Sequence, residues 1–134
     1  MSKAKKHWRA EAPAGRRVLV VEDEPLIALA LEETLAEHGF AVVAWAQTVA
    51  AALRHIADTR FDVALLDLRI GAESVEPVAD RLDAIGLPFV FATGYGRAAL
   101  PRAHSARPIV EKPFHAEALI DALAAAARRA AREA

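Results

Sequence analysis

Short apolar runs alternate with segments of helical periodicity along the chain, and this alternation restricts the fold more than any other feature of the sequence. The runs have the length and composition of strands buried on both faces: residues 18–21, 40–45, 61–67, 88–92 and 108–110. Strands that alternate with helices form a parallel sheet whose two faces are both covered by helices. We therefore predict an α/β fold with a doubly wound, five-stranded parallel sheet in the order 2-1-3-4-5.

Helix signals occur between and after these runs: at residues 25–38, after Thr48, at residues 76–85 and at residues 116–133. Thr48 is suited to cap its helix, which we expect to bury Val49, Leu53 and Ile56 on one face. The stretch "GYGRAALPRAHSAR", between the fourth and fifth strands, contains two glycines and a proline. We predict only a short turn near residues 97–100 there, so that the fourth helix is short or irregular.

The composition is that of a soluble globular protein, with 54% hydrophobic and 26% charged residues. A net charge of −1 gives no electrostatic reason to expect nucleic acid as a partner, and the absence of cysteine excludes disulfides and thiol catalysis. No apolar run approaches a membrane span, and the N-terminus lacks the apolar core of a signal peptide. We therefore expect a cytoplasmic protein with no membrane partner and no specific nucleic-acid partner.

The N-terminal stretch "MSKAKKHWRAEAPAGRR" is basic and contains a proline and a glycine that would break a helix. We expect residues 1–16 to be a basic, flexible extension and residues 17–134 to form a single domain. A weak docking arm or nucleic-acid arm is the alternative for the extension, and the sequence leaves that alternative open.

Polar side chains stand where four of the predicted strands end. Glu22 and Asp23 follow the first strand, Asp67 ends the third, Thr93 follows the fourth and Lys112 follows the fifth. Strands one and three are neighbours in the predicted order, and the carboxyl ends of parallel strands meet at one edge of the sheet. We therefore expect these five residues to meet in one site.

Three carboxylates against one lysine make a negatively charged hole that suits a hard divalent cation. Mg²⁺ fits best, because it binds through one or two carboxylates, keeps several waters and accepts phosphate oxygens. An aspartate can also attack phosphorus and form an acyl phosphate. The cation and the Lys112 ammonium would neutralise the phosphoryl group, and the Thr93 hydroxyl can hydrogen-bond it.

Residues 17 to about 130 resemble the receiver domain of bacterial response regulators, the phospho-accepting part of two-component signalling systems. The resemblance rests on the Glu22-Asp23 pair and on three motifs in the family's order, each at its own strand end: "LLDLRI", "FATGYG" and "EKPF". The fold implied by the resemblance has the flavodoxin-like strand order.

The resemblance also implies roles for the site residues. Asp67 is implied as the phospho-acceptor, and Mg²⁺ as an ion held by Asp23, Asp67 and the backbone carbonyl of Arg69, with Glu22 reaching it through water. Thr93 and Lys112 are implied to contact the phosphoryl group. A cis Lys112-Pro113 peptide bond is also usual in the family.

The sequence departs from the family pattern at two places. Most receivers have a proline a few residues beyond the acceptor, whereas this chain has Gly71, which suggests a more mobile loop. The aromatic switch residue that the family usually has on strand five is replaced by Ile109, and Tyr95 is the candidate substitute. The stretch "PFVFATGYG" resembles a subgroup of small stand-alone receivers with a Phe-Ala-Thr-Gly-Tyr signature, often paired with atypical histidine kinases.

We expect a stand-alone receiver that is not an enzyme and acts by protein contact, as a monomer or weak homodimer. Its implied partners are a histidine kinase or histidine phosphotransfer protein and a downstream protein target. Phosphate relay, phosphate sink and phosphorylation-gated binding all remain open, and a degenerate receiver that binds partners without phosphorylation is the alternative.

A flavodoxin-type cofactor site is disfavoured because "EDEP" would repel a phosphate. A haloacid-dehalogenase-like phosphatase is disfavoured because Arg69 stands where its second acid would be.

The remaining candidate residues receive structural interpretations. The histidines show no metal-ligand spacing, and we expect them to be surface or capping residues: His7, His38, His55, His104 and His115. Trp45, at the end of the second strand, is expected to be a packing residue.

Overall fold

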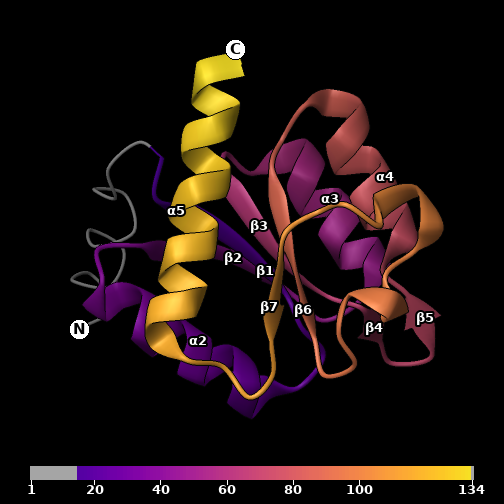
Figure 1. Cartoon of the computed structure of the whole chain (residues 1–134), viewed down its shortest axis with the longest axis horizontal. Helices are drawn as coiled ribbons and strands as arrows, with labels where there is room; N and C mark the ends of the chain where they lie inside the picture. Colours follow the sequence, from indigo (N-terminus) through magenta and orange to yellow (C-terminus); the bar gives the residue numbers. More distant parts are fainter. Residues whose placement is uncertain (1–14, 134) are drawn as a thin grey trace.

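The computed structural model describes residues 15–133, and a five-stranded parallel sheet forms their centre (Figure 1). Its strands lie in the order β2-β1-β3-β6-β7, which is the predicted 2-1-3-4-5 order counted within this sheet. Their bounds are β1 Arg17–Val21, β2 Ala41–Ala46, β3 Val63–Asp67, β6 Phe89–Thr93 and β7 Ile109–Glu111. The predicted fold class and strand order are therefore confirmed.

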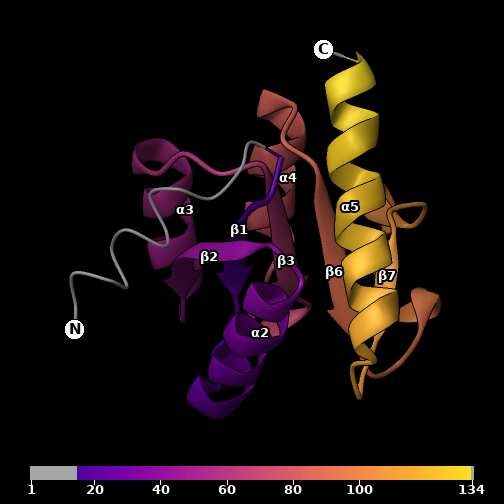
Figure 2. The ribbon, with the colours of Figure 1, turned by 90° about the vertical axis from the view of Figure 1, so that its left-hand side faces the viewer.

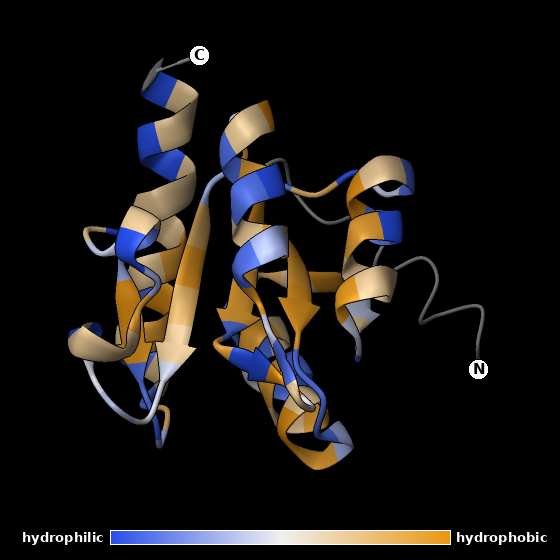
Figure 3. Ribbon diagram, turned by 90° about the vertical axis from the view of Figure 1, so that its right-hand side faces the viewer, coloured by the Kyte–Doolittle hydropathy of each residue, from blue (hydrophilic) through white to orange (hydrophobic). Residues whose placement is uncertain are grey.

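Helices cover both faces of the sheet (Figures 1 and 2). The helices α2 (Pro25–Glu37) and α5 (Ala116–Glu133) pack with one set of strand side chains, which includes Val18 and Val20. The helices α3 (Val49–Asp58) and α4 (Glu76–Ile85) pack with the alternate set. Figure 3 shows hydrophobic strands enclosed by helices of mixed character. Within residues 15–133, no helix has both the length and the hydrophobicity needed to cross a membrane.

The helix α3 begins as predicted, but the prediction of its buried face is wrong for one residue. The Thr48 hydroxyl accepts a hydrogen bond from the Ala51 N–H at 3.0 Å, which confirms the cap. Ala52 is fully buried beside Val49 and Ile56, whereas Leu53 is 36% exposed. Because the next turn can present either i+3 or i+4 to the core, the smaller side chain occupies the place nearest the sheet.

The segment after β3 forms a small antiparallel hairpin rather than an irregular loop. Its strands are β4 (Arg69–Ile70) and β5 (Glu73–Ser74), and Gly71 lies at the turn between them with φ +64°. A positive φ is readily adopted by glycine. The glycine that suggested a mobile loop therefore serves a defined turn.

The segment between β6 and β7 contains two single-turn 3₁₀ helices, η1 (Arg97–Ala99) and η2 (Arg102–His104). The first confirms the predicted short turn and the absence of a full helix, and the second was not predicted. Arg97 Nη1 donates to the carbonyls of Ser105 (3.1 Å) and Arg107 (2.7 Å), which ties the two ends of the segment together.

His104 is buried, so the expectation that it is a surface or capping residue is wrong. Its side chain is 2% exposed and meets the rings of Phe89 and Phe91 edge-on, at centroid distances of 5.7 and 6.1 Å. Its Nε2 lies 2.8 Å from Oδ1 of Asp80 on α4. Aromatic contact and one carboxylate partner together explain how the ring is accommodated.

Residues 1–14 of the predicted basic extension lie outside the described residues. Arg16, at its end, places its guanidinium 5.3 Å from the centroid of the Phe40 ring, a cation–π distance.

Candidate functional site

The sheet register brings the predicted site residues to one edge. Asp67 ends β3 opposite Ala92 of β6, and Thr93 at the end of β6 lies opposite Glu111 of β7. The N–H of Lys112 donates to the carbonyl of Thr93 at 2.9 Å, which continues the β6–β7 ladder by one hydrogen bond. The peptide bond between Lys112 and Pro113 is cis, as the resemblance implied.

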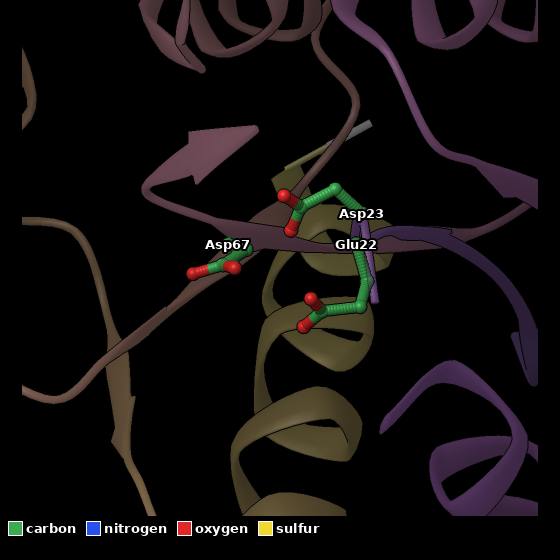
Figure 4. Close-up of side chains that lie close together, drawn as sticks. All are labelled: Glu22, Asp23 and Asp67. Atoms are coloured by element: carbon green, nitrogen blue, oxygen red, sulfur yellow. The ribbon is translucent and has the colours of Figure 1, made fainter. Parts of the chain in front are cut away.

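Three carboxylates converge at this edge. Figure 4 shows the side chains of Glu22 and Asp23, which follow β1, lying close to that of Asp67, which ends β3. Each offers an oxygen that lies within 4.8 Å of the oxygens of the other two. This geometry matches the grouping that the predicted strand order required.

The carboxyl group of Glu22 is held in a buried position. The side chain is 3% exposed, its Oε2 accepts from the Glu24 N–H at 3.1 Å, and its Oε1 lies 3.7 Å from Lys112 Nζ. Burial raises the pKa of Glu22 to about 7, and the negative charge of Asp67 adds to the rise. The Glu24 N–H and the Lys112 ammonium oppose it without cancelling it. The largest cause is burial, so the raised pKa indicates a desolvated carboxyl group rather than an excess of charge at the site.

The hairpin after β3 is attached to the acid pair. The N–H of Gly71 donates to Oδ2 of Asp23 at 2.9 Å. The guanidinium of Arg69 donates to the carbonyl of Ala72 at 2.7 Å, so the Arg69 side chain is engaged within the hairpin. That side chain does not neutralise the acids. The role of the Arg69 backbone carbonyl as a metal ligand stays a prediction.

Lys112 is the cation closest to the acids among the described ion pairs. Its Nζ lies 3.2 Å from Oδ1 of Asp67, and its side chain is 26% exposed. One ammonium cannot balance three carboxylates, and oxygen atoms are the ligands that Mg²⁺ prefers. The set of three carboxylate donors therefore fits a divalent cation.

Thr93 is buried and engaged in a local turn. Its hydroxyl oxygen accepts from the Tyr95 N–H at 2.9 Å, and the hydroxyl donates to the Gly96 carbonyl at 3.4 Å. The second bond is long, so the hydroxyl proton is available to a stronger acceptor at little cost. Thr93 lines a cleft of about 540 Å³ together with Asp67 and Lys112.

The two switch candidates lie in different environments. Tyr95 is 86% exposed at the rim of the same cleft. Ile109 is partly buried and packs against the core that the sheet shares with α3 and α4. Their roles as switch residues stay predictions.

Sequence reasoning missed one residue of the site. Trp45 was expected only to pack, but it is 36% exposed and its indole N–H donates to the Glu22 carbonyl at 2.7 Å. The position of Trp45 at the end of the strand next to β1 was the one feature of the sequence that could have indicated a contact with the acid pair. Among residues 15–133, the acid cluster of Glu22, Asp23 and Asp67 is the only one of its kind.

Comparison with known proteins agrees with this geometry. The family model of the response regulator receiver domain matches residues 18–124. The chain belongs to this family. Receiver domains generally bind Mg²⁺ at an acidic pocket, and the carboxylates of this chain form such a group. The family also operates in two-component signalling, which implies interaction with histidine kinases or phosphotransfer proteins.

Individual proteins are also similar to the chain. The chain is 32% identical over 115 residues to the sensory transduction protein LytT of Enterococcus faecalis, covering 83% of the chain and 48% of LytT. It thus spans about half the length of that curated relative. The solution structure of SdrG from Sphingomonas melonis Fr1 is 42% identical, with a TM-score of 0.72 over 81% of this chain and 93% of SdrG. The BeF3-activated conformation of SdrG, from Pseudomonas melonis Fr1, is 40% identical, with a TM-score of 0.72 over 84% of this chain and 96% of that one.

Proposed function

We propose that this receiver accepts a phosphoryl group from a phosphohistidine onto Asp67 in a Mg²⁺-dependent reaction, and signals by protein contact or phosphorelay. The observation that carries the proposal is the position of Asp67, whose carboxylate faces Glu22 and Asp23 and lies 3.2 Å from Lys112 Nζ. A degenerate receiver would have no need to keep three carboxylates together, since their mutual repulsion costs stability without an ion.

The side chains of the site have separable roles in this transfer. An oxygen of Asp67 attacks phosphorus, the bond from phosphorus to the donor imidazole breaks, and the electron pair leaves with the imidazole. The leaving imidazole is neutral when its second nitrogen carries the proton. Lys112 and Thr93 stabilise the oxygens of the transferring group by charge and by a hydrogen bond.

Asp23, Asp67 and the Arg69 carbonyl would hold the ion, with Glu22 reaching it through water. When bound, Mg²⁺ supplies positive charge to the phosphoryl oxygens. The protein is then a phospho-acceptor that is consumed and regenerated, rather than an enzyme that turns over a separate substrate. This proposal treats residues 17–134 as one receiver domain.

An apolar groove beside the site suits the phosphohistidine donor. The groove lies between α2 and α5, has a volume of about 520 Å³, and is lined by Leu26, Ile27 and Phe114 among others. Leu26 is 80% exposed, and Lys112 lines both this groove and the cleft at Asp67. We propose that a helix of the donor protein packs in the groove, because that position would bring its phosphohistidine toward Asp67.

The sequence "FATGY" at residues 91–95 supports placing the chain in the subgroup with that signature. The likeness to SdrG, whose BeF3-activated conformation is known, supports using beryllofluoride as a phosphoryl mimic here. We propose Tyr95 as the residue that responds to movement of Thr93, because the two are joined by a hydrogen bond from the Tyr95 N–H.

Labelling by a phosphohistidine donor tests the proposal. The wild type should gain one acid-stable, hydroxylamine-labile phosphoryl group, and chelation of Mg²⁺ should prevent labelling. Asp67→Asn should not be labelled, whereas Asp121→Asn, a change of an exposed aspartate on α5, should be labelled normally. Equal labelling of Asp67→Asn and wild type would overturn the assignment.

A further inference from the structure

Trp45 and Ala46, at the end of β2, hold both backbone polar groups of Glu22. β2 runs parallel to β1 with Val20 opposite Trp45 and Val21 opposite Ala46. The N–H of Glu22 donates to the carbonyl of Ala46 at 3.0 Å, so the ladder continues one residue beyond β1. The carbonyl of Glu22 accepts from the indole Nε1–H of Trp45 at 2.7 Å. The Trp45 side chain thus donates a hydrogen bond to the first residue of the Glu22-Asp23 pair.

This carbonyl belongs to the peptide unit that joins Glu22 to Asp23. A peptide unit is planar. Because hydrogen bonds hold both the N–H and the C=O of Glu22, they fix the peptide units on either side of it. They therefore restrict the dihedral angles of Glu22 and the direction in which the chain continues to Asp23. The distance of 2.7 Å is at the short end of the range for an N–H···O hydrogen bond. The indole is a donor only, so its role in the bond is unambiguous.

We propose that Trp45 is a positioning residue for the Mg²⁺ site, acting through the Glu22 carbonyl to keep the carboxylates of Glu22 and Asp23 directed at Asp67. The inference rests on the proposed function, since it concerns the ion that phosphoryl transfer needs. Second-layer hydrogen bonds of this kind commonly affect metal affinity about 10- to 100-fold.

The ring of Trp45 also has an ordinary packing role, which the test has to separate from the hydrogen bond. The ring lines a groove between α2 and β2 together with Ala28, Leu29 and Val43. Trp45→Phe retains an aromatic ring in this groove and removes the N–H. Leu29→Ala removes apolar contact from the same groove, and Leu29 has no described hydrogen bond to Glu22, so it is the matched control.

Mg²⁺ affinity, measured by isothermal titration calorimetry on the full chain without a phosphoryl donor, tests the proposal. Trp45→Phe should weaken Mg²⁺ binding about tenfold, while Leu29→Ala should bind Mg²⁺ as the wild type does. The midpoint of thermal unfolding in EDTA should fall in both variants, because Trp45→Phe loses a hydrogen bond and part of the ring, and Leu29→Ala loses apolar contact. Wild-type affinity in Trp45→Phe, or an equal loss in Leu29→Ala, would overturn the proposal.

A second measurement observes the indole N–H of Trp45 directly, without changing Trp45. It keeps the test valid if Trp45→Phe folds poorly. The chain has two tryptophans, Trp8 and Trp45, so Trp8→Phe leaves a single indole N–H signal in an NMR spectrum. That signal should shift during a Mg²⁺ titration with the same dissociation constant as calorimetry gives, and an indole signal that does not respond to Mg²⁺ would contradict the proposal. Because both measurements omit the phosphoryl donor, they can succeed even if Asp67 proves not to be the phospho-acceptor.

Discussion

The Lys112 ammonium lies 3.2 Å from Oδ1 of Asp67, although β6 separates the strands that carry the two residues. The lysine side chain therefore extends across the carboxyl end of β6, beside Thr93, to reach the carboxylate. A phosphoryl group on Asp67 would lie between Asp67 and Lys112. Lys112 would then pair with the phosphoryl group, which carries more negative charge than the carboxylate. Because Lys112 directly follows β7, we expect a change at Asp67 to affect that strand.

Lys112→Ala should separate phosphorylation from the response to it. The rate of labelling should fall on the order of a hundredfold, because one charge that stabilises the transferring group is lost, but the carboxylates remain and labelling should still be detectable. Beryllofluoride should shift the amide signals of Ile109 and Val110 in the wild type and not in Lys112→Ala. Lys112→Arg, which keeps the charge, is the control. A full set of shifts on β7 in Lys112→Ala would contradict this role.

The raised pKa of Glu22 predicts how the stability of the ion-free protein depends on pH. The pKa of Glu22 is about 7 in the folded protein and 4.5 in the unfolded chain, so between these values the folded state holds more protons. The free energy of unfolding should therefore fall as pH rises from about 4.5 to about 7, by no more than about 3 kcal/mol. Urea unfolding in EDTA at pH 5.5 and pH 8 measures this fall.

Glu22→Gln should lack this part of the pH dependence, whereas Glu117→Gln, an exposed carboxylate on α5, should keep it. Added Mg²⁺ should stabilise the wild type more at pH 8 than at pH 5.5, because the ion binds deprotonated ligands. An identical pH dependence in the wild type and Glu22→Gln would show that Glu22 does not titrate in this range.

The sequence predicted the sheet order and the gathering of the site residues because both follow from regular rules. The carboxyl ends of parallel strands meet at one edge, so the residues that end β3 and β6 and those that follow β1 and β7 had to meet there. The contacts of His104 and Trp45 could not be predicted in the same way. Each contact depends on the direction in which one ring points toward a neighbouring element. The presence of a histidine or an indole in the sequence does not indicate whether a hydrogen-bond partner lies near it in the fold. The β4–β5 hairpin was missed because strands of two residues give no periodicity.

The exposed side chain of Leu26 should matter for the donor and not for the fold. Leu26→Asp should raise the dissociation constant for a phosphohistidine donor protein about tenfold or more, because a charge would be buried in an apolar contact. Leu29→Asp is the matched control, since it lies on the same helix, is 52% exposed, and lines the groove on the other side of α2. Labelling by the small donor acetyl phosphate should be unchanged in both variants. Equal effects of the two changes on the donor protein would argue against the α2–α5 groove.

Side-chain contacts with α4 hold the segment between β6 and β7. Nε2 of His104 lies 2.8 Å from Oδ1 of Asp80, and Arg107 forms an ion pair with Asp83, so two side chains join this segment to α4. Thr93 begins the segment, and its hydroxyl would have to leave the Gly96 carbonyl to reach a phosphoryl group. Movement at Thr93 is therefore opposed by the two contacts with α4.

Asp80→Ala should release one of these contacts and make the segment easier to rearrange. We expect hydrogen exchange of the amides of residues 97–107 to become faster, and beryllofluoride to produce its shifts at Thr93 and Tyr95 at lower concentration, because less of the resting conformation has to be overcome. The loss of global stability should be about 1–3 kcal/mol, since the His104 side chain is 2% exposed and its Nε2 would lose its carboxylate partner. Asp121→Ala, on α5, is the control that changes the same charge elsewhere. If exchange in residues 97–107 stays at the wild-type rate in Asp80→Ala, the His104–Asp80 contact does not restrain the segment.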